Sequence, residues 1–343
     1  MSRSKALLAE IVGSVADGLE SMQEILEGEL RDPSAAVADM LDHVARFRGK
    51  QLRGALVLLC GEATGNTSKE HSKVAAIVEM IHLATLVHDD ILDGAEVRRR
   101  VACVNQRWNN QVAVLLGDYL YSRAFALSTE LSSRLCSSML SKTTKQICIG
   151  EIDQSTLRYD FSMTQERYEG VCGAKTASLF AAACELGARY PGGSDDESSH
   201  DESSHDERGE KTGELMRSVG WNLGLGFQII DDYLDLTGSE EIAGKTVGVD
   251  VEDGKVTLPV LHVYSKASDA VRERIREIYT QPELPNRADE LRQAVDLEAG
   301  LDYARKRANE LIENALSSMA VLPESQARSS IESIGEFFLK RNW

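Results

Sequence analysis

The sequence has few of the residues that break helices or attract nucleic acid. Only 6 of its 343 residues are proline, and alternating β-branched runs are scarce, whereas an all-β sandwich needs a turn signal about every 8 to 12 residues. Lysine and arginine number 38 against 55 aspartates and glutamates, a net charge of −17, and so acidic a chain is repelled by a polyanion. These shortages argue against an all-β fold and exclude nucleic acid as a partner.

Cysteine and long apolar runs are also sparse. The six cysteines are Cys60, Cys103, Cys136, Cys148, Cys172 and Cys184. They form no CxxC pair and have no histidine at ligand spacing, a pattern typical of reduced, buried thiols in a cytosolic protein. No apolar run reaches the roughly 18 residues of a membrane span. Residues 6–16 are interrupted by Glu10 and followed by Asp17 and Glu20, which predicts an amphipathic first helix, not a signal peptide. We therefore expect a cytoplasmic protein.

What the chain does have is helical periodicity. Apolar residues recur with a helical period over 72–92, 111–128 and 213–236, and an apolar share of 42% can bury a core. In 72–92 the predicted stripe is Val74, Ile77, Ile81, Leu83, Val87 and Leu92. The length would suit two domains, but one large helical domain over residues 1–343 also fits it and is our prediction.

The segment 192–211 differs from the rest in composition. It contains a doubled ESSHD unit, eight acidic residues and two basic ones, with almost nothing apolar. Such a segment cannot bury itself, so we expect a solvated, mobile loop inserted between two helices. The alternative is a metal-sequestering or regulatory segment, in which His200 and His205 would join the carboxylates.

Two acidic clusters carry the strongest functional signal. Asp89 and Asp93, in HDDILD, are four residues apart and share one helix face. Asp231 and Asp235, in DDYLD, repeat that spacing after another apolar run. Carboxylates this close repel each other and need cations where the helix is otherwise apolar. Hard oxygen ligands suit Mg²⁺, which takes one or two carboxylates together with water and substrate phosphate. The clusters therefore predict a magnesium-bridged phosphate ester.

Fixed positive charges follow each cluster in the sequence, and others occur in RGKQLRG and just before Thr176. They are Lys50, Arg53, Arg98, Arg99, Arg100, Lys175, Lys245 and Lys255. Together they offer more cations than one diphosphate requires, which indicates two diphosphate pockets.

These motifs, HDDILDGAEVRRR, then KT, GFQIIDDYLDLTG and GKTVGVDVEDGKVTLP, resemble in their order and spacing those of the trans-polyprenyl diphosphate synthases. The resemblance implies that Asp89 and Asp93 bind two magnesium ions and the allylic diphosphate, with Asp90 supporting them. It implies that Asp231 binds a third ion, with Asp232 and Asp235 nearby. The allylic diphosphate would be held by Arg98, Lys175, Lys245 and Lys255. Isopentenyl diphosphate would be held by Lys50, Arg53, His82 and Arg99. Thr176 and Gln228, acting with Lys175 and Lys245 as the catalytic set, would lie near the allylic cation.

The family resemblance also implies a fold and a reaction. The expected fold is an all-α, single-domain helical bundle of the isoprenoid synthase type, with both acidic turns facing a central active-site cavity. The expected reaction ionises an allylic diphosphate, adds isopentenyl diphosphate and loses a proton, so it needs no Ser, Cys or His nucleophile. We expect a homodimer, and a peripheral membrane contact during product release is compatible with the sequence.

Product length is expected to depend on the helix that carries the first cluster. Thr85 lies one turn, about 6 Å, before Asp89, and Ala84 adjoins it. Short-chain members of the family carry aromatic residues there, whereas both residues are small here. HLATLVHDDILDGAEVRR most resembles the members that make long quinone side chains, so we predict an octaprenyl-like product. A farnesyl or geranylgeranyl diphosphate synthase remains an alternative, and so does simple close packing of helices at these two positions.

Other functions fit less well. Gly244-Lys245-Thr246 lacks the spacing and the strand of a phosphate-binding loop. His82 and His88-Asp89 are similar to the metal-binding pairs of helical phosphohydrolases, but that class leaves the second cluster unexplained. Class I terpene cyclases carry an Asn/Ser/Glu motif in place of the second cluster. A non-catalytic subunit of a heteromeric synthase would usually lack one cluster, and both are intact here.

Overall fold

The structure is a computed structural model that describes residues 3–191, 202–238, 247–281, 284 and 286–340. Regular structure in these residues is helical except for one two-stranded antiparallel hairpin, β1 (Val97–Arg98) and β2 (Val101–Ala102). The all-α fold class is therefore confirmed. Contacts divide the chain into two compact units, and each is described by itself. The single-domain assignment stays a prediction.

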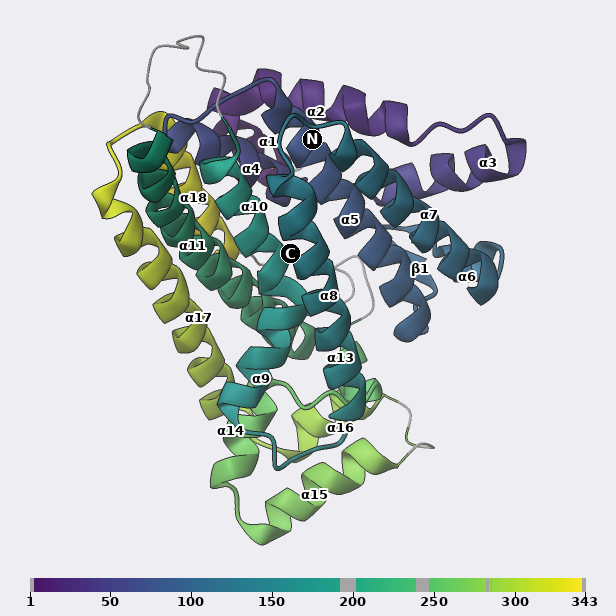
Figure 1. Ribbon diagram of the computed structural model, residues 1–343. Helices are drawn as coiled ribbons and strands as arrows, with labels where there is room; N and C mark the ends of the chain where they lie inside the picture. The colour runs from purple at the N-terminus through teal and green to yellow at the C-terminus, as the bar shows by residue number, and fades with distance from the viewer. Residues whose placement is uncertain (1–2, 192–201, 239–246, 282–283, 285, 341–343) are drawn as a thin grey trace. The chain divides into compact units, whose positions relative to one another are not determined.

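Unit 1 comprises residues 1–144, 179–220 and 316–334. Its helices are α1 (Arg3–Ile11), α2 (Ala16–Glu29), α3 (Ala35–Val44), α4 (Leu52–Ala63), α5 (Glu70–Leu92), α6 (Val104–Arg107), α7 (Asn110–Thr129), and parts of α8 (Leu135–Thr156), α10 (Ser178–Arg189), α11 (Glu202–Thr237), α17 (Glu298–Ser318) and α18 (Gln326–Leu339), with short helical turns η1 (Gly13–Val15), η2 (Ala45–Phe47) and η4 (Met319–Val321). Helix α5 contacts α2, α4, α6 and α7, and Figure 1 shows α5 and α7 side by side. The β1–β2 hairpin follows α5 after four residues and contains Arg98, Arg99 and Arg100.

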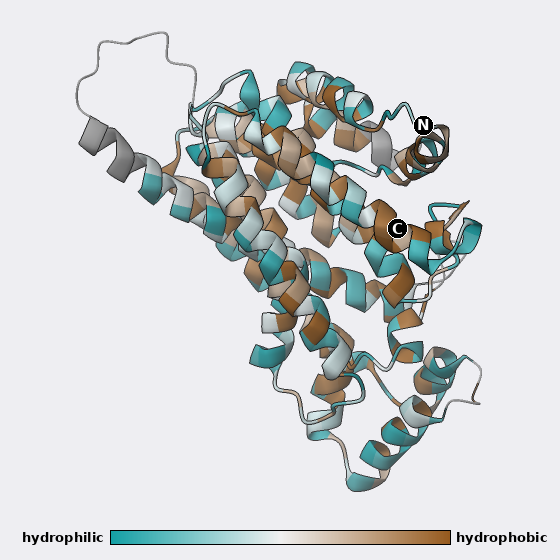
Figure 2. Cartoon of the chain, turned by 45° about the vertical axis from the view of Figure 1, so that its right-hand side comes forward, coloured by the Kyte–Doolittle hydropathy of each residue, from teal (hydrophilic) through white to brown (hydrophobic). Residues whose placement is uncertain are grey.

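Helix α5 is buried almost all round. Every residue from Val74 to Ile81 is buried, which is the pattern of a central helix and not of an amphipathic surface helix. The predicted one-sided stripe is therefore wrong for this helix, and its last member, Leu92, is 50% exposed. Figure 2 shows how apolar and polar positions mix along the helices. Since α5 is enclosed, the polar residues that it does bury need partners within the protein.

Unit 2 comprises residues 145–178, 221–315 and 335–343. Besides its parts of α8, α10, α11, α17 and α18, it contains α9 (Gln165–Cys172), the π-helical turn η3 (Gly173–Ala177), α13 (Val249–Glu252), α14 (Leu258–Lys266), α15 (Asp269–Thr280) and α16 (Arg287–Ala294). One apolar cluster forms its core and includes Leu225, Ile229, Leu234, Val260 and Leu311. This core fixes the apolar side of α11, and thereby fixes the orientation of the aspartates that interrupt it.

The predicted helices are found, with different limits. Helices α5, α7 and α11 cover the stretches 72–92, 111–128 and 213–236. Helix α11 begins at Glu202, so the second half of the acidic insert 192–211 is helical and not a loop, whereas 192–201, with His200, lies outside the described residues. Five of the cysteines are buried free thiols, but Cys148 is exposed, contrary to expectation. No helix in the described ranges is long and apolar enough to cross a membrane.

Candidate active site

The first acidic cluster ends helix α5. Asp89 and Asp93 are half-buried, and the backbone N–H of Asp93 donates to the Asp89 carbonyl over 2.8 Å, closing the last turn. Asp90 is fully buried and points elsewhere: Nε and Nη2 of Arg98 both lie 2.8 Å from its Oδ1. Burial raises the pKa of Asp90, and the Arg98 guanidinium opposes that rise. Asp90 therefore fastens the hairpin to α5, and the two aspartates at i and i+4 are left to share a face.

The hairpin turns through two arginines in left-handed conformations. Arg99 has φ 51° and Arg100 has φ 66°, which places both central residues of a two-residue turn where glycine or asparagine is favoured. Arg99 reaches back to Arg48, donating from Nη1 to its carbonyl at 3.5 Å. It lies on Gly49, where a Cβ would be 2.0 Å from Nη2. Glycine at residue 49 thus lets a guanidinium lie against the backbone ahead of α4.

Unit 1 gathers most of the predicted isopentenyl-diphosphate residues. His82 lies within the electrostatic field of Arg53, Arg98 and Arg99, and burial, followed by these three charges, holds its pKa well below the usual range. The Arg53 guanidinium stacks 4.3 Å from the centre of the Phe180 ring. These positive charges, together with a neutral histidine, favour the binding of an anion. Lys50, just before α4, is exposed.

The residues predicted to set product length lie one turn before Asp89. Ala84 is fully buried and Thr85 half-buried. The Thr85 hydroxyl donates to the His82 carbonyl at 2.7 Å, so its hydrogen-bonding requirement is met within the helix. The rest of the side chain is a single methyl group.

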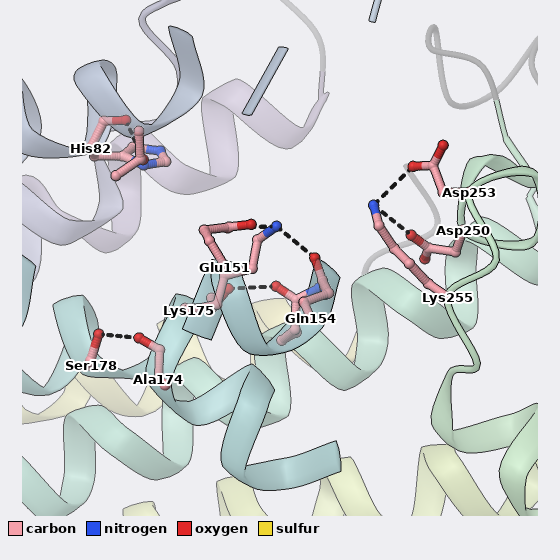
Figure 3. A network of polar contacts seen from close by, with 12 residues as sticks. His82, Glu151, Gln154, Ala174, Lys175, Ser178, Asp250, Asp253 and Lys255 are labelled. Atoms are coloured by element: carbon pink, nitrogen blue, oxygen red, sulfur yellow. Dashed lines mark hydrogen bonds and ion pairs between the residues drawn. The ribbon is translucent and has the colours of Figure 1, made fainter. Parts of the chain in front are cut away.

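In unit 2, Lys175 and Thr176 lie on the π-helical turn η3. Single π turns inside α-helices are frequent at functional sites because they re-aim side chains. The Lys175 ammonium lies 2.7 Å from a Glu151 carboxylate oxygen and donates to Gln154 Oε1 at 2.9 Å. Figure 3 shows this ammonium between its two partners. An incoming diphosphate would have to compete with Glu151 for this charge.

A chain of hydrogen bonds joins Thr176 to the second acidic cluster. The Thr176 hydroxyl donates to Gln228 Oε1 at 2.8 Å, and Gln228 Nε2 donates to Asp232 Oδ1 at 2.8 Å. The other oxygen of Asp232 accepts the Tyr168 hydroxyl at 2.5 Å. Burial, and then the nearby Asp250 carboxylate, raise the pKa of Asp232 to about 8. Asp232 is thus a buried support of this chain, and half-buried Asp231 is the more open carboxylate.

Asp235 and Lys255 meet through a loop at α13. The backbone N–H of Asp250 donates to Asp235 Oδ2 at 3.0 Å. The Lys255 ammonium pairs with Asp250 at 3.5 Å and with Asp253 at 3.0 Å, as Figure 3 shows. Asp250 therefore belongs to the second acidic cluster, beside Asp232.

Within each unit, the structure brings predicted residues together. Unit 1 groups Arg53, His82, Asp90, Arg98 and Arg99, and unit 2 groups Thr176, Gln228 and Asp232 beside Lys175. Lys245 lies outside the described residues.

Sequence reasoning missed several supporting residues. They are Glu79, Glu151, Gln154, Tyr168 and Asp250. Of these residues, only Glu79 had a signal in the sequence, because it is a charged residue within the apolar run of α5.

The donor set fits magnesium. Among the described residues, no group of three or more His, Cys, Asp or Glu side chains is gathered tightly enough to hold a metal ion by itself. Magnesium rarely uses such an all-protein cage, because it retains water and takes one or two carboxylates together with substrate phosphate. Pairs of aspartates at i and i+4, at the C-terminal end of α5 and within α11, supply ligands of that number and kind.

Comparisons with known proteins agree with one another. The family model "Polyprenyl synthetase" matches residues 34–298. The chain is 33% identical to the all-trans-nonaprenyl-diphosphate synthase (geranyl-diphosphate specific) of Rhodobacter capsulatus, over 97% of each chain. It is 30% identical to the octaprenyl diphosphate synthase of Escherichia coli, over 94% of this chain and 99% of that one. A crystal structure of polyprenyl synthase from Caulobacter crescentus, complexed with calcium and isoprenyl diphosphate, superposes with a TM-score of 0.88 at 29% identity, covering 98% of both chains.

Proposed function

The chain belongs to the polyprenyl synthetase family and is a prenyltransferase, and we propose that it condenses isopentenyl diphosphate with an allylic diphosphate to give a long-chain all-trans polyprenyl diphosphate. The observation that carries the long-chain assignment is the pair of small residues one turn before Asp89, buried Ala84 and half-buried Thr85. A hydrocarbon tail that starts at a diphosphate held by Asp89 would meet no aromatic side chain at either position.

In this proposal the allylic diphosphate is held by Arg98, Lys175, Lys245 and Lys255. Asp90 holds Nε and Nη2 of Arg98, so the remaining N–H groups of this guanidinium would face the diphosphate. Lys175 and Lys255 contribute ammonium groups that carboxylates orient in advance. Fixed charges of this kind stabilise the negative charge that develops as the carbon–oxygen bond breaks, because they need not reorganise. Lys245, of GKT, is assigned the same role from its sequence position.

Asp89, Asp93 and Asp231 are the proposed ligands of about three Mg²⁺ ions, and both acidic clusters act on the same diphosphate. Bound divalent ions would supply Lewis-acid stabilisation of the leaving pyrophosphate. Asp90 and Asp232, both buried in hydrogen bonds, serve in this proposal as supports that orient Arg98 and Gln228. Family members take a divalent metal, as the calcium-bearing relative illustrates.

The carbocation left by ionisation needs lone pairs and no nucleophile. Thr176 and Gln228 are joined by a hydrogen bond in which the hydroxyl is the donor, so the threonine oxygen keeps its lone pairs available. Isopentenyl diphosphate, held by Arg53, Arg99, Lys50 and His82, would present its alkene to that cation. The burial and positive surroundings that keep His82 neutral make it a hydrogen-bonding partner and not an additional cation. The proton lost afterwards would pass to the departing pyrophosphate.

We further propose that the enzyme acts as a homodimer. Helix α7 leaves the adjacent residues Val114 and Leu115 43% and 61% exposed, and contiguous exposed apolar surface is typical of protein–protein contacts. Sedimentation equilibrium of the purified chain tests this: a mass near twice 37.7 kDa is expected, and a monomer at micromolar concentration contradicts it.

The experiment that tests the function uses the purified chain alone. It is supplied with Mg²⁺, labelled isopentenyl diphosphate and, in turn, dimethylallyl, geranyl or farnesyl diphosphate, and the dephosphorylated products are separated by chromatography. Products near eight isoprene units that disappear with EDTA are expected. Farnesol or geranylgeraniol alone would refute the long-chain assignment, and no product from any starter would refute catalysis by the isolated chain. The Thr85→Phe variant should shorten the product, whereas Thr64→Phe, at the end of α4, should not.

A further inference from the structure

A buried carboxylate lies behind the cation group of unit 1. Glu79 is only 7% exposed and lies on α5, one turn before His82. Its Oε1 accepts a hydrogen bond of 2.8 Å from the backbone N–H of Gly54. Burial raises its pKa, while the backbone N–H groups of Gly54 and Arg53 and the charges of Arg53 and Arg99 favour the ionised form. Glu79 is not among the residues proposed to bind the metal ions or the diphosphates.

The hydrogen bond to Gly54 serves the beginning of α4. The first turn of a helix has N–H groups without intrahelical partners, and usually the N-cap side chain satisfies one of them. Here the N-cap residue, Gln51, is left-handed with φ 50° and makes no such bond. Glu79 supplies the acceptor from α5 instead, and a carboxylate also suits the positive end of the helix dipole.

The contact leaves almost no room for movement. A Cβ at residue 54 would lie 2.5 Å from Met22 Sδ and 3.1 Å from Glu79 Cγ. Glycine therefore allows α2 and α5 to close on the first turn of α4. Because Arg53 belongs to that same turn, any shift of the Glu79 carboxylate moves the backbone that carries Arg53.

We propose that Glu79 is a positioning residue for the isopentenyl-diphosphate site. Its carboxylate holds the first turn of α4 from within α5 and attracts the Arg53 and Arg99 side chains, so that both guanidinium groups are oriented before substrate arrives. The inference rests on the proposed function for its assignment of Arg53, Arg99 and His82 to that substrate. It adds a residue that touches no substrate and acts through those that do.

A simple counter-charge would behave differently from a positioning residue. A negative charge beside an anion site opposes anion binding, so its removal alone should strengthen binding. If geometry dominates, removing the charge and moving it should both weaken binding. Glu79→Gln removes the charge and keeps an acceptor oxygen. Glu79→Asp keeps the charge and withdraws it by one methylene.

The test measures binding of isopentenyl diphosphate by calorimetry in EDTA and the KM of both substrates with Mg²⁺. Glu96→Gln is the matched control, because it removes one exposed carboxylate two residues from Arg98. We expect both Glu79 variants to weaken isopentenyl diphosphate binding and raise its KM about tenfold, with the allylic KM within twofold of wild type and Glu96→Gln unchanged.

The outcomes separate the inference from the proposed function. Tighter binding by Glu79→Gln with an unchanged Glu79→Asp would overturn the positioning role and leave a counter-charge. Equal weakening for both substrates would overturn it as well. Failure of the wild-type protein to bind isopentenyl diphosphate at all would instead refute the proposed function. Should Glu79→Gln fail to fold, Glu79→Asp decides the matter, since wild-type affinity in that variant contradicts the inference.

Discussion

Replacing Arg98 by methionine should destabilise the protein through Asp90. The Asp90 side chain is 1% exposed, and two nitrogens of Arg98 lie 2.8 Å from its Oδ1. Removing one partner of a buried ion pair typically costs about 3–5 kcal/mol, because the remaining charge stays buried without its partner. The Arg98 side chain keeps 26% of its surface exposed, so solvent screening lowers the expected cost to about 2–3 kcal/mol.

The assay is a double-mutant cycle on the free energy of unfolding in urea. Asp90→Asn should cost about 1–2 kcal/mol, less than Arg98→Met, because the arginine left behind can reach water. The double variant should cost about 1–2 kcal/mol less than the sum of the two single changes, since the unpaired carboxylate is then absent. Strictly additive costs, or a loss below about 0.5 kcal/mol for Arg98→Met, would show that the pair does not secure the hairpin to α5.

Three further changes have defined outcomes. The pKa of His71 lies below its ordinary value of 6.5, chiefly because the ring is buried. The unfolded chain therefore binds the proton more readily, so the contribution of His71 to the free energy of unfolding is complete above about pH 6.5 and declines as the pH falls further. His71→Gln should flatten that decline in urea denaturation between about pH 6.5 and 5, and an unchanged slope would contradict the assignment. Arg100→Gly should raise the free energy of unfolding by about 1 kcal/mol, since φ is 66° there, and a loss of stability would argue against strain. Tyr168→Phe should cost about 1.5–3 kcal/mol because Asp232 loses a donor and should lower kcat severalfold through Gln228, whereas wild-type kcat would remove Asp232 from the support of that residue.

Local patterns were enough to predict the helices and the acidic motifs. Periodicity identified α5, α7 and α11 because apolar spacing is a property of each segment alone. It could not show that α5 is enclosed, since burial on every side depends on helices far away in the chain. The exposure of Cys148 escaped prediction for the same reason.

The candidate site was predictable in its motifs and not in its supports. The i, i+4 spacing identified Asp89 with Asp93 and Asp231 with Asp235. That Asp90 would turn to Arg98, and that Asp232 would bind Gln228 and Tyr168, depends on contacts between separate segments. The π-helical turn under Lys175 and the loop that brings Asp250 to Asp235 have no signature in local composition.

Whether both acidic clusters act on one diphosphate is best tested by calorimetry of inorganic pyrophosphate binding in the presence of metal. Wild type should bind pyrophosphate in Mg²⁺ at a site that EDTA abolishes. Asp89→Ala with Asp93→Ala, and separately Asp231→Ala, should each weaken that same binding event by tenfold or more. Two independent metal-dependent binding events in the wild type, with each variant losing only one of them, would show that the two clusters bind separate diphosphates.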